Sequence, residues 1–365
     1  MREDFTSAKA WLERIQALPL ERPVAVMNVC GGHERSLTQL GLRGVLPPNV
    51  KLIPGPGCPV CVCPEEDLAD AIALALSGQV TLVAFGDMLR VPINAPKGEV
   101  RSLAEARAKG ADVRPISSPQ EAVALAAKSE KPVVFFVAGF ETTTAPVAAM
   151  LAQGVPDTLS VLLAARFTWP AVNMLLKSGD AALDALIAPG HVAAVMGAAE
   201  WGFVAERYHL PVAVAGFSAN SLLAALYSVL RQTLAGKPFL DNCYAELVAP
   251  EGNKRAQALL AEVMDVTDAN WRGIGVIPRS GFALRGEWRR YDARERFEFA
   301  ALPRRRAGEM PPGCDCAAVV LGKKQPDQCR LYGKACTPQS PVGPCMVSDE
   351  GACHIWWQGG TRAAA

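Results

Sequence analysis

Short runs of apolar, mostly β-branched residues recur along the first two thirds of the chain, separated by segments with helical periodicity. The runs occupy residues 24–29, 51–53, 80–85, 133–138, 159–164, 192–196 and 212–215. Residues 65–77 are a clear helix candidate, because Pro64 precedes the segment and Gly78 follows it. Residues 145–153 and 218–234 are two further candidates. Strands that alternate with helices predict βαβ units and mostly parallel sheets.

The alternation predicts an α/β fold with two Rossmann-like parallel-sheet domains, at residues 23–127 and 128–240. From residue 241 the pattern weakens, and from Pro311 onward Cys, Gly and Pro dominate. A short tail of this kind buries little core by itself, and a metal centre is a usual substitute for a core. We therefore expect a small cysteine-rich domain at residues 241–365, completed by residues 1–22.

The composition is that of a globular protein without a large charged surface. Half of the 365 residues are apolar, a fifth are charged, and the formal net charge is +1. This balance argues against a disordered chain and against binding to nucleic acid through a broad basic face. The longest uncharged run, residues 210–230, contains Pro211 and Gly216 and predicts a buried strand and helix rather than a membrane span. Residues 1–20 lack the apolar core of a secretory leader, so we expect a cytoplasmic protein.

The eleven cysteines are clustered along the chain. Four lie between residues 30 and 63, six lie between residues 314 and 353, and Cys243 stands alone. In a cytoplasmic protein, clustered cysteines indicate metal binding or redox chemistry rather than structural disulfides. We expect the isolated Cys243 to be a small, half-buried hydrophobic residue.

The sequence Cys-Gly-Gly-His-Glu at residues 30–34 directly follows the first predicted strand. Ligands of α/β proteins bind at the carboxyl ends of strands, so Cys30 and His33 are candidate site residues. A glycine-rich turn with an incidental cysteine explains the motif equally well.

A second motif, Gly-Pro-Gly-Cys-Pro-Val-Cys-Val-Cys-Pro at residues 55–64, also follows a predicted strand. Cys58 and Cys61 have the Cys-x-x-Cys spacing of a metal-binding or redox-active pair. The positive end of the next helix would favour thiolates, whereas the acidic residues 65–67 in its first turn oppose that effect. The sign of the net pKa shift therefore stays open. Cys63 either caps the helix or serves as a reserve thiol.

The third motif is Gly-Phe-Glu-Thr-Thr-Thr at residues 139–144. Glu141, at a strand end, is placed for acid–base chemistry or for hydrogen bonding to a ligand, whereas the threonines alternatively cap the next helix. Residues 189–191, Asp87 and Glu200 are similarly ambiguous. The chain contains no phosphate-binding or dinucleotide-binding glycine loop, so the α/β pattern does not imply a nucleotide.

The tail carries six cysteines, at positions Cys314, Cys316, Cys329, Cys336, Cys345 and Cys353. Four thiolates suit a [4Fe–4S] cluster or a structural zinc ion. The tail lacks the paired Cys-x2-Cys elements of zinc ribbons, which favours an iron–sulfur cluster. Two surplus cysteines would then be available as a redox pair beside it.

Together these motifs resemble those of the HypD family of [NiFe]-hydrogenase maturation factors. The matching segments are residues 30–34, 55–61, 139–143, 189–192, 251–253, 336–338 and 345–353, in this order. The resemblance covers about residues 20 to 360. Arg35, Ala188 and Cys63 depart from the family pattern, and none of them replaces an expected ligand.

The resemblance implies a scaffold with redox activity that assembles the Fe(CN)2CO group of the hydrogenase. Members of the family work in a complex with a HypC-type chaperone and receive cyanide from HypE, as a thiocyanate made from carbamoyl phosphate by HypF. By the same resemblance, Cys30, Cys58 and Cys61 would bind the iron. His33 and Glu141 would support it in the same cleft.

For the tail, the resemblance implies a [4Fe–4S] cluster. We assign its ligands to Cys314, Cys329, Cys336 and Cys353, which leaves Cys316 and Cys345 as the redox pair. Two other functions stay open. One is an iron–sulfur thiol–disulfide reductase resembling ferredoxin:thioredoxin reductase, and the other is a binding module held together by zinc.

Overall fold

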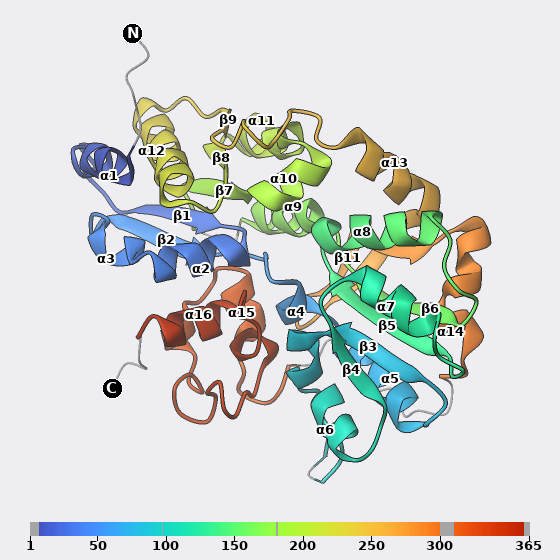
Figure 1. Ribbon diagram of the computed structural model, residues 1–365. Helices are drawn as coiled ribbons and strands as arrows, with labels where there is room; N and C mark the ends of the chain where they lie inside the picture. Colours follow the sequence, from blue (N-terminus) through green and yellow to red (C-terminus); the bar gives the residue numbers. More distant parts are fainter. Residues whose placement is uncertain (1–6, 97, 180–181, 300–309, 361–365) are drawn as a thin grey trace.

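A computed structural model describes residues 7–96, 98–179, 182–299 and 310–360 of the chain. It contains two parallel β-sheets flanked by helices, an antiparallel ribbon and a cysteine-rich tail (Figure 1). This arrangement confirms the predicted α/β class with two parallel sheets. In the described residues, no helix combines the length and the apolar character needed to cross a membrane.

The first sheet has the strand order β2 (Val50–Pro54), β1 (Val24–Asn28), β7 (Ala185–Pro189), β8 (Val212–Ala215) and β9 (Leu240–Asn242). All neighbouring strands in it are parallel. The second sheet has the order β4 (Val113–Ile116), β3 (Thr81–Phe85), β5 (Val133–Gly139) and β6 (Leu159–Ala165), and it is also parallel throughout. Strands β5 and β6 are fully buried, which explains why they read as continuous apolar runs.

An antiparallel ribbon of β10 (Met264–Trp271) and β11 (Gly275–Leu284) follows the two sheets. The described α-helices are α1 (Ala8–Gln16), α2 (Gly31–Gln39), α3 (Leu42–Val45), α4 (Pro59–Val62), α5 (Glu65–Leu76), α6 (Leu103–Ala108), α7 (Pro119–Ala126), α8 (Glu141–Ala152), α9 (Thr168–Ser178), α10 (Gly190–Met196), α11 (Phe203–Tyr208), α12 (Ala219–Ala235), α13 (Lys254–Val263), α14 (Ala293–Arg296), α15 (Cys316–Val320) and α16 (Ala352–Gln358). Short 3-10 helices span Gly86–Arg90, Ala198–Gly202, Gly286–Tyr291, Pro326–Gln328 and Pro344–Met346.

One predicted strand is wrong. Residues 192–196 belong to helix α10, and the strand that precedes it, β7, was not predicted. A short apolar run is compatible with a buried strand and with a buried helix, and Val192 and Ala193 are indeed buried in the helix. The predicted helix at residues 65–77 corresponds to α5, and Ser218 caps α12 as its neighbouring sequence suggests.

Each sheet takes strands from both sides of residues 127 and 128, where we placed a boundary, and the division into domains stays a prediction. Residues 23–127 contribute β1 and β2 to the first sheet but β3 and β4 to the second. Residues 128–240 likewise divide, because β5 and β6 join the second sheet and β7 and β8 return to the first. The two sheets therefore interleave along the sequence, and the chain crosses between them twice.

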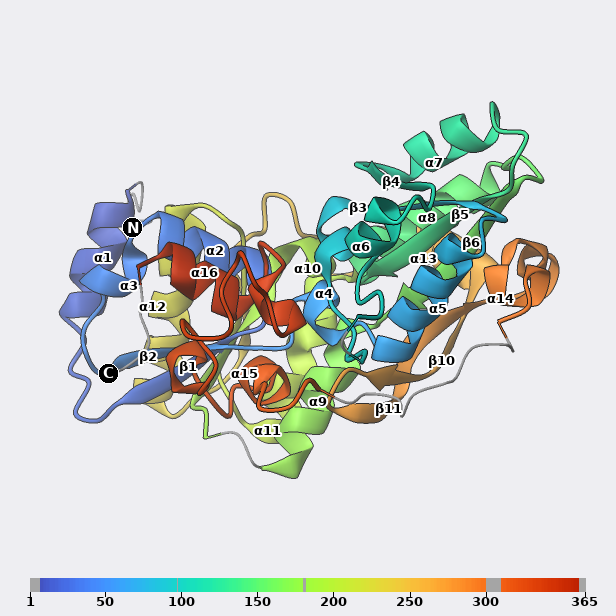
Figure 2. The ribbon, with the colours of Figure 1, turned by 90° about the horizontal axis from the view of Figure 1, so that it is seen from below.

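The tail packs against helices that follow strands β1 and β2 rather than forming a remote unit. Helix α16 contacts α2, and helix α15 contacts α4 (Figures 1 and 2). Arg43 links these parts further, because its guanidinium pairs with Glu34 and lies 5.1 Å from the ring centre of Trp356. The tail thus reaches the loops that follow β1 and β2.

Candidate functional site

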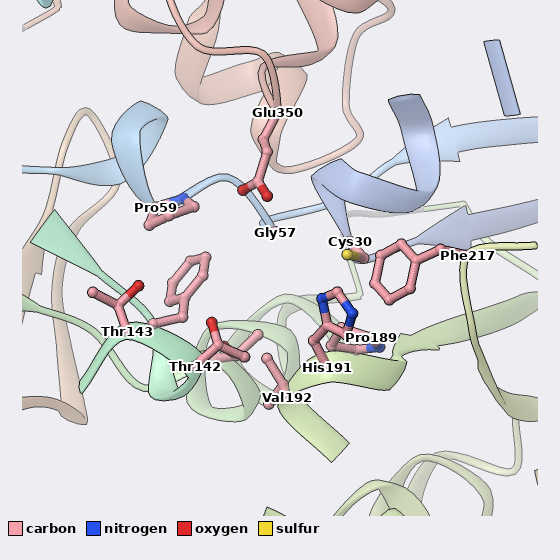
Figure 3. A pocket seen from close by; sticks show the side chains of 12 residues that line it. Cys30, Gly57, Pro59, Thr142, Thr143, Pro189, His191, Val192, Phe217 and Glu350 are labelled. Atoms are coloured by element: carbon pink, nitrogen blue, oxygen red, sulfur yellow. The ribbon is translucent and has the colours of Figure 1, made fainter. Parts of the chain in front are cut away.

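The carboxyl ends of strands from both sheets surround one cavity of about 110 Å³. Its lining residues are Cys30, Gly57, Pro59, Phe140, Thr142, Thr143, Thr168, Pro189, His191, Val192, Phe217 and Glu350. Figure 3 shows the side chains of Cys30, His191, Thr142 and Glu350 converging on this space. The site therefore joins the loops after β1, β2, β5, β7 and β8, together with the tail.

Cys30 lies at the junction between β1 and α2. The loop after β2 packs directly against it, since a Cβ atom on Gly57 would lie 1.5 Å from the carbonyl oxygen of Val29 and 2.7 Å from Cα of Cys30. Only glycine fits this approach of two backbones. Burial, followed by the charge of Glu350, raises the pKa of the Cys30 thiol to about 12. Without a bound metal, the thiol is therefore protonated at neutral pH.

Cys58 and Cys61 form a disulfide, with a distance of 5.3 Å between their Cα atoms. Both residues are buried, and Sγ of Cys58 accepts a hydrogen bond from the backbone N–H of Cys61 at 3.2 Å. The Cys-x-x-Cys spacing therefore does place the two sulfur atoms within bonding reach. In this oxidised form neither sulfur is a free thiolate.

The acidic first turn of α5, which follows the disulfide loop, is compensated by other parts of the chain. Glu65 pairs with Arg272 at 3.3 Å, and Glu66 accepts a hydrogen bond from Asn270 at 2.7 Å. Asp67 is paired with two cations, Arg166 at 3.3 Å and Arg294 at 2.6 Å. These partners lie far away in the sequence, which is why the first turn alone could not decide the electrostatics of the loop.

His33 is fully buried and is not among the residues that line the cavity. Its ring nitrogens lie 3.1 Å from Oδ1 of Asn28 and 2.9 Å from the carbonyl oxygen of Ala215. Burial lowers the pKa of His33 to about 3, so we take the ring as neutral. The ring supports the site from behind, because Phe217 packs against it at 4.7 Å and itself lines the cavity.

Glu141 is the first residue of α8 and is fully buried. Its carboxylate accepts two hydrogen bonds from Thr168, one from the backbone N–H at 2.7 Å and one from the hydroxyl at 2.6 Å. Burial raises its pKa to about 7 although these bonds oppose the shift. Glu141 therefore does not line the cavity itself. It holds Thr168, which does line the cavity.

Two lining residues, His191 and Glu350, were missed or undervalued in the sequence. His191 follows β7, and its ring stacks on Phe217 at a centroid distance of 3.8 Å. Glu350 comes from the tail, and loss of water around its carboxyl raises its pKa to about 7, aided by Asp87 and opposed by Arg35. The signal for Glu350 was its place in the cysteine-rich segment 345–353, which the motif comparison covered without singling out this residue.

Five of the six tail cysteines, all except Cys329, gather into one cluster. Sγ of Cys314 lies 3.3 Å from Sγ of Cys316, and Cys345 shares hydrogen bonds with Cys316 and Cys353. These bonds lower the pKa of Cys345 and raise that of Cys353, because the cluster favours the thiolate on Cys345. Cys336 lies close enough for Cys316 and Cys314 to add to the rise in its pKa that burial causes.

The contacts do not follow the division that we expected from the sequence. Cys316 and Cys345, the expected redox pair, lie with Cys314 and Cys353, two of the expected ligands. For Cys329 we find no comparable sulfur contact within the described residues, although it is buried. The assignment of four ligands and one pair stays a prediction.

The donor set of the tail fits a sulfur-bound metal cluster in kind and number, because it offers more than four buried or half-buried thiols in one place. No three His, Cys, Asp or Glu side chains among the described residues are arranged around a single metal ion. The tail therefore offers the right type of donor atom for a cluster, but its described residues do not form a ready-made metal-binding geometry. Helix α4, which carries Cys61, contacts the 3-10 helix Pro344–Met346 and helix α15, which carry Cys345 and Cys316, so the two thiol-rich regions meet in space.

Known proteins match the chain over nearly its whole length. The sequence model of the HypD family, described as "Hydrogenase formation hypA family", matches residues 6–360. The hydrogenase maturation factor HypD of Rhodobacter capsulatus is 40% identical over 350 residues, covering 94% of this chain and 92% of its own. The HypD factor of Escherichia coli K12 is 39% identical over 343 residues, covering 93% of this chain and 90% of its own. A putative hydrogenase expression/formation protein of Methanocaldococcus jannaschii is 39% identical over 337 residues, covering 91% of each chain. The chain therefore belongs to the HypD family of hydrogenase maturation factors.

Proposed function

We propose that this chain is a cytoplasmic scaffold and redox component that assembles the Fe(CN)2CO group of [NiFe]-hydrogenases. In this proposal it works with a HypC-type chaperone and receives cyanide from HypE. The observation that carries the proposal is a small cavity lined by Cys30 and by both chain neighbours of Cys58, Gly57 and Pro59. The Cys58–Cys61 disulfide in turn shares one hydrophobic core with the tail thiols.

The size of the cavity supports a small cargo. Its volume of about 110 Å³ is well below the roughly 300–1,000 Å³ of pockets that hold drug-sized ligands. An iron ion with diatomic ligands is a cargo of the right scale. Soft thiolates suit such an iron, and Cys30 is the free thiol that lines the cavity.

In this proposal the Cys58–Cys61 disulfide must be reduced before its two sulfur atoms can bind iron. Opening Cys58–Cys61 takes two electrons and two protons and leaves two thiols, which then lose protons to the extent that they bind metal. A [4Fe–4S] cluster bound by tail cysteines would supply electrons one at a time. Helix α4, which carries Cys61, contacts the 3-10 helix Pro344–Met346, which carries Cys345, so electrons would have a short path.

The other groups that line the cavity can accept a proton or donate hydrogen bonds to cyanide. The pKa of Glu350 is about 7, so its carboxylate can accept the proton that Cys30 releases on binding iron. Thr142, Thr143 and His191 present hydroxyl and imidazole groups to the cavity, where they can donate hydrogen bonds to cyanide nitrogen. Thr168, held by Glu141, fixes one wall of the cavity.

The proposal is tested by anaerobic co-purification with the HypC-type chaperone, followed by infrared spectroscopy and metal analysis. We expect bands from Fe–CN and Fe–CO in the unmodified protein and their loss in Cys30→Ala, Cys58→Ala and Cys61→Ala. Cys243→Ala is the matched control, because Cys243 lies outside the cavity. Retention of the bands in all three site variants would refute the assignment.

A second function is favoured by the same disulfide. Its position beside the tail thiols would also suit an iron–sulfur thiol–disulfide reductase. Stoichiometric reduction of a protein disulfide, by protein that contains no iron outside the cluster, would support this function over the scaffold. About one zinc per chain, with no iron or sulfide, would exclude both functions.

A further inference from the structure

Arg272 is a buried cation at the tip of the β10–β11 ribbon, outside the cavity described above. Its side chain is 0% exposed. The backbone N–H donates to the carbonyl oxygen of Val62 at 3.0 Å, and Nη2 donates to that of Pro92 at 2.7 Å. Nη2 also lies 3.3 Å from Glu65, which is 3% exposed. The ribbon tip is thereby tied to the chain just after the Cys58–Cys61 disulfide.

The other two nitrogens of this guanidinium have no partner. Nε and Nη1 are buried and make no hydrogen bond in the structure. Burying donors of a charged group without acceptors is costly, since water is lost and nothing replaces it. A native protein rarely keeps two such donors idle, so their acceptor is expected to be a group that is present only in the working state.

Two sulfur-bearing segments flank the ribbon tip. Gly273, with φ of +70°, packs so closely that a Cβ atom would lie 2.6 Å from Met310 and 2.8 Å from Ala317, in helix α15. The tip also contacts Val62, between Cys61 and Cys63, through the backbone hydrogen bond of Arg272. Arg272 thus lies in a turn that contacts both the disulfide loop and helix α15, which begins at Cys316.

We propose that Arg272 is a positioning residue whose free N–H groups bind and stabilise negatively charged sulfur in the tail once the tail cysteines hold an iron–sulfur cluster. This inference rests on the proposed function, in which the tail binds such a cluster. A fixed positive charge beside the cluster favours its reduced, more negative form. Arg272 would therefore raise the reduction potential of the electron source that faces the Cys58–Cys61 disulfide.

The test compares Arg272→Lys with the double variant Arg272→Met/Glu65→Gln. The double variant removes the charge and also avoids leaving Glu65 as a buried, unpaired carboxylate; its Gln side chain can still accept the hydrogen bond that the N–H of Asn94 donates at 2.8 Å. Arg285→Met is the matched control, because the ion pair of Arg285 with Asp265 is exposed. Each full-length protein is loaded anaerobically with iron and sulfide.

Two quantities are measured. The first is the midpoint potential of one-electron reduction, followed by electron paramagnetic resonance with dithionite as the reductant. The second is the rise in Tm on loading, relative to the same protein without iron. We expect the double variant to show a more negative midpoint potential and a smaller rise in Tm. Arg272→Lys should lie between it and the unmodified protein, and Arg285→Met should match the unmodified protein.

A residue with a merely structural role would lower Tm with and without iron equally and leave the potential unchanged. An unchanged potential and an unchanged rise in Tm in the folded double variant would therefore overturn the inference while the proposed function stands. Failure of the unmodified protein to take up iron and sulfide would overturn the cluster in the proposed function, and this inference with it.

Discussion

At the scale of single residues, burial rather than residue type decides what each group can do. Cys30, Glu141 and His33 were all identified in the sequence, but only Cys30 lines the cavity. Glu141 acts through Thr168, and His33 supports Phe217. The sequence revealed these residues because each belongs to a motif that follows a strand. It could not reveal their depth, which depends on segments that pack from elsewhere.

The buried carboxyl of Glu141 predicts a pH-dependent stability. Its folded pKa of about 7 lies above its ordinary value of 4.5, so the protonated form stabilises the fold below pH 4.5 and this stabilisation is lost as pH rises to about 7. Relative to Glu141→Gln, the free energy of unfolding should fall by about 3 kcal/mol over this interval and level off above it.

Denaturant unfolding of both proteins at several pH values measures this difference. Burial, and then the charge of Glu141, also raises the pKa of Glu200 to about 8. The comparison is therefore made in a Glu200→Gln background, where only one of the two carboxyls titrates. A difference that stays constant from pH 4.5 to pH 7 would show that Glu141 titrates normally.

At the scale of elements, the site depends on close contact between loops that follow different strands. Gly57, after β2, touches the backbone of Val29 and Cys30, after β1. The glycines of these motifs were visible in the sequence, but their purpose was not. An approach between two backbones is a property of paired strands, and the pairing of β1 with β2 is tertiary information.

Gly57→Ala is expected to destabilise the protein by about 3 kcal/mol or more, because the new methyl group would overlap a carbonyl oxygen. It should also displace Cys30 and so reduce iron binding at the site. Denaturant unfolding and iron content measure the two effects. Gly44→Ala is the control, since a Cβ atom there meets nothing within 4 Å. Equal stability of the two variants would contradict the contact.

The sulfur contacts of the tail predict an order of importance among its cysteines. Cys316→Ser and Cys345→Ser should lose more iron and sulfide than Cys329→Ser, because both thiols touch other thiols of the cluster. The measurement is iron and sulfide content after anaerobic loading. The reverse order would instead support the ligand set that we assigned from the sequence, which includes Cys329 and omits Cys316 and Cys345.

At the scale of the whole molecule, two interleaved sheets turn their carboxyl ends toward one cavity, and the tail closes it with Glu350. The oxidised disulfide beside this cavity predicts that redox state controls loading. Protein with the Cys58–Cys61 disulfide should bind no ferrous iron at this site, and protein reduced with dithiothreitol should bind about one ion, because thiolates are the expected ligands.

Equilibrium binding of Fe(II) under anaerobic conditions tests whether redox state controls loading. The tail cysteines are first occupied by a preassembled cluster, so that they do not bind the added iron. A Cys58→Ala/Cys61→Ala variant should bind little iron in either condition. Equal binding by the oxidised and the reduced unmodified protein would show that the disulfide does not limit loading.

The sequence by itself determined the α/β class, the motifs at strand ends and the family, because these depend on local periodicity and on residue identity. Only the tertiary structure decided that β7 returns to pair with β1, that the acidic turn of α5 is compensated by Arg272 and Arg166, and that Glu350 reaches the cavity. The physical reason is that burial, charge pairing and sulfur contact depend on distances between residues far apart in the chain. Periodicity carries no information about those distances.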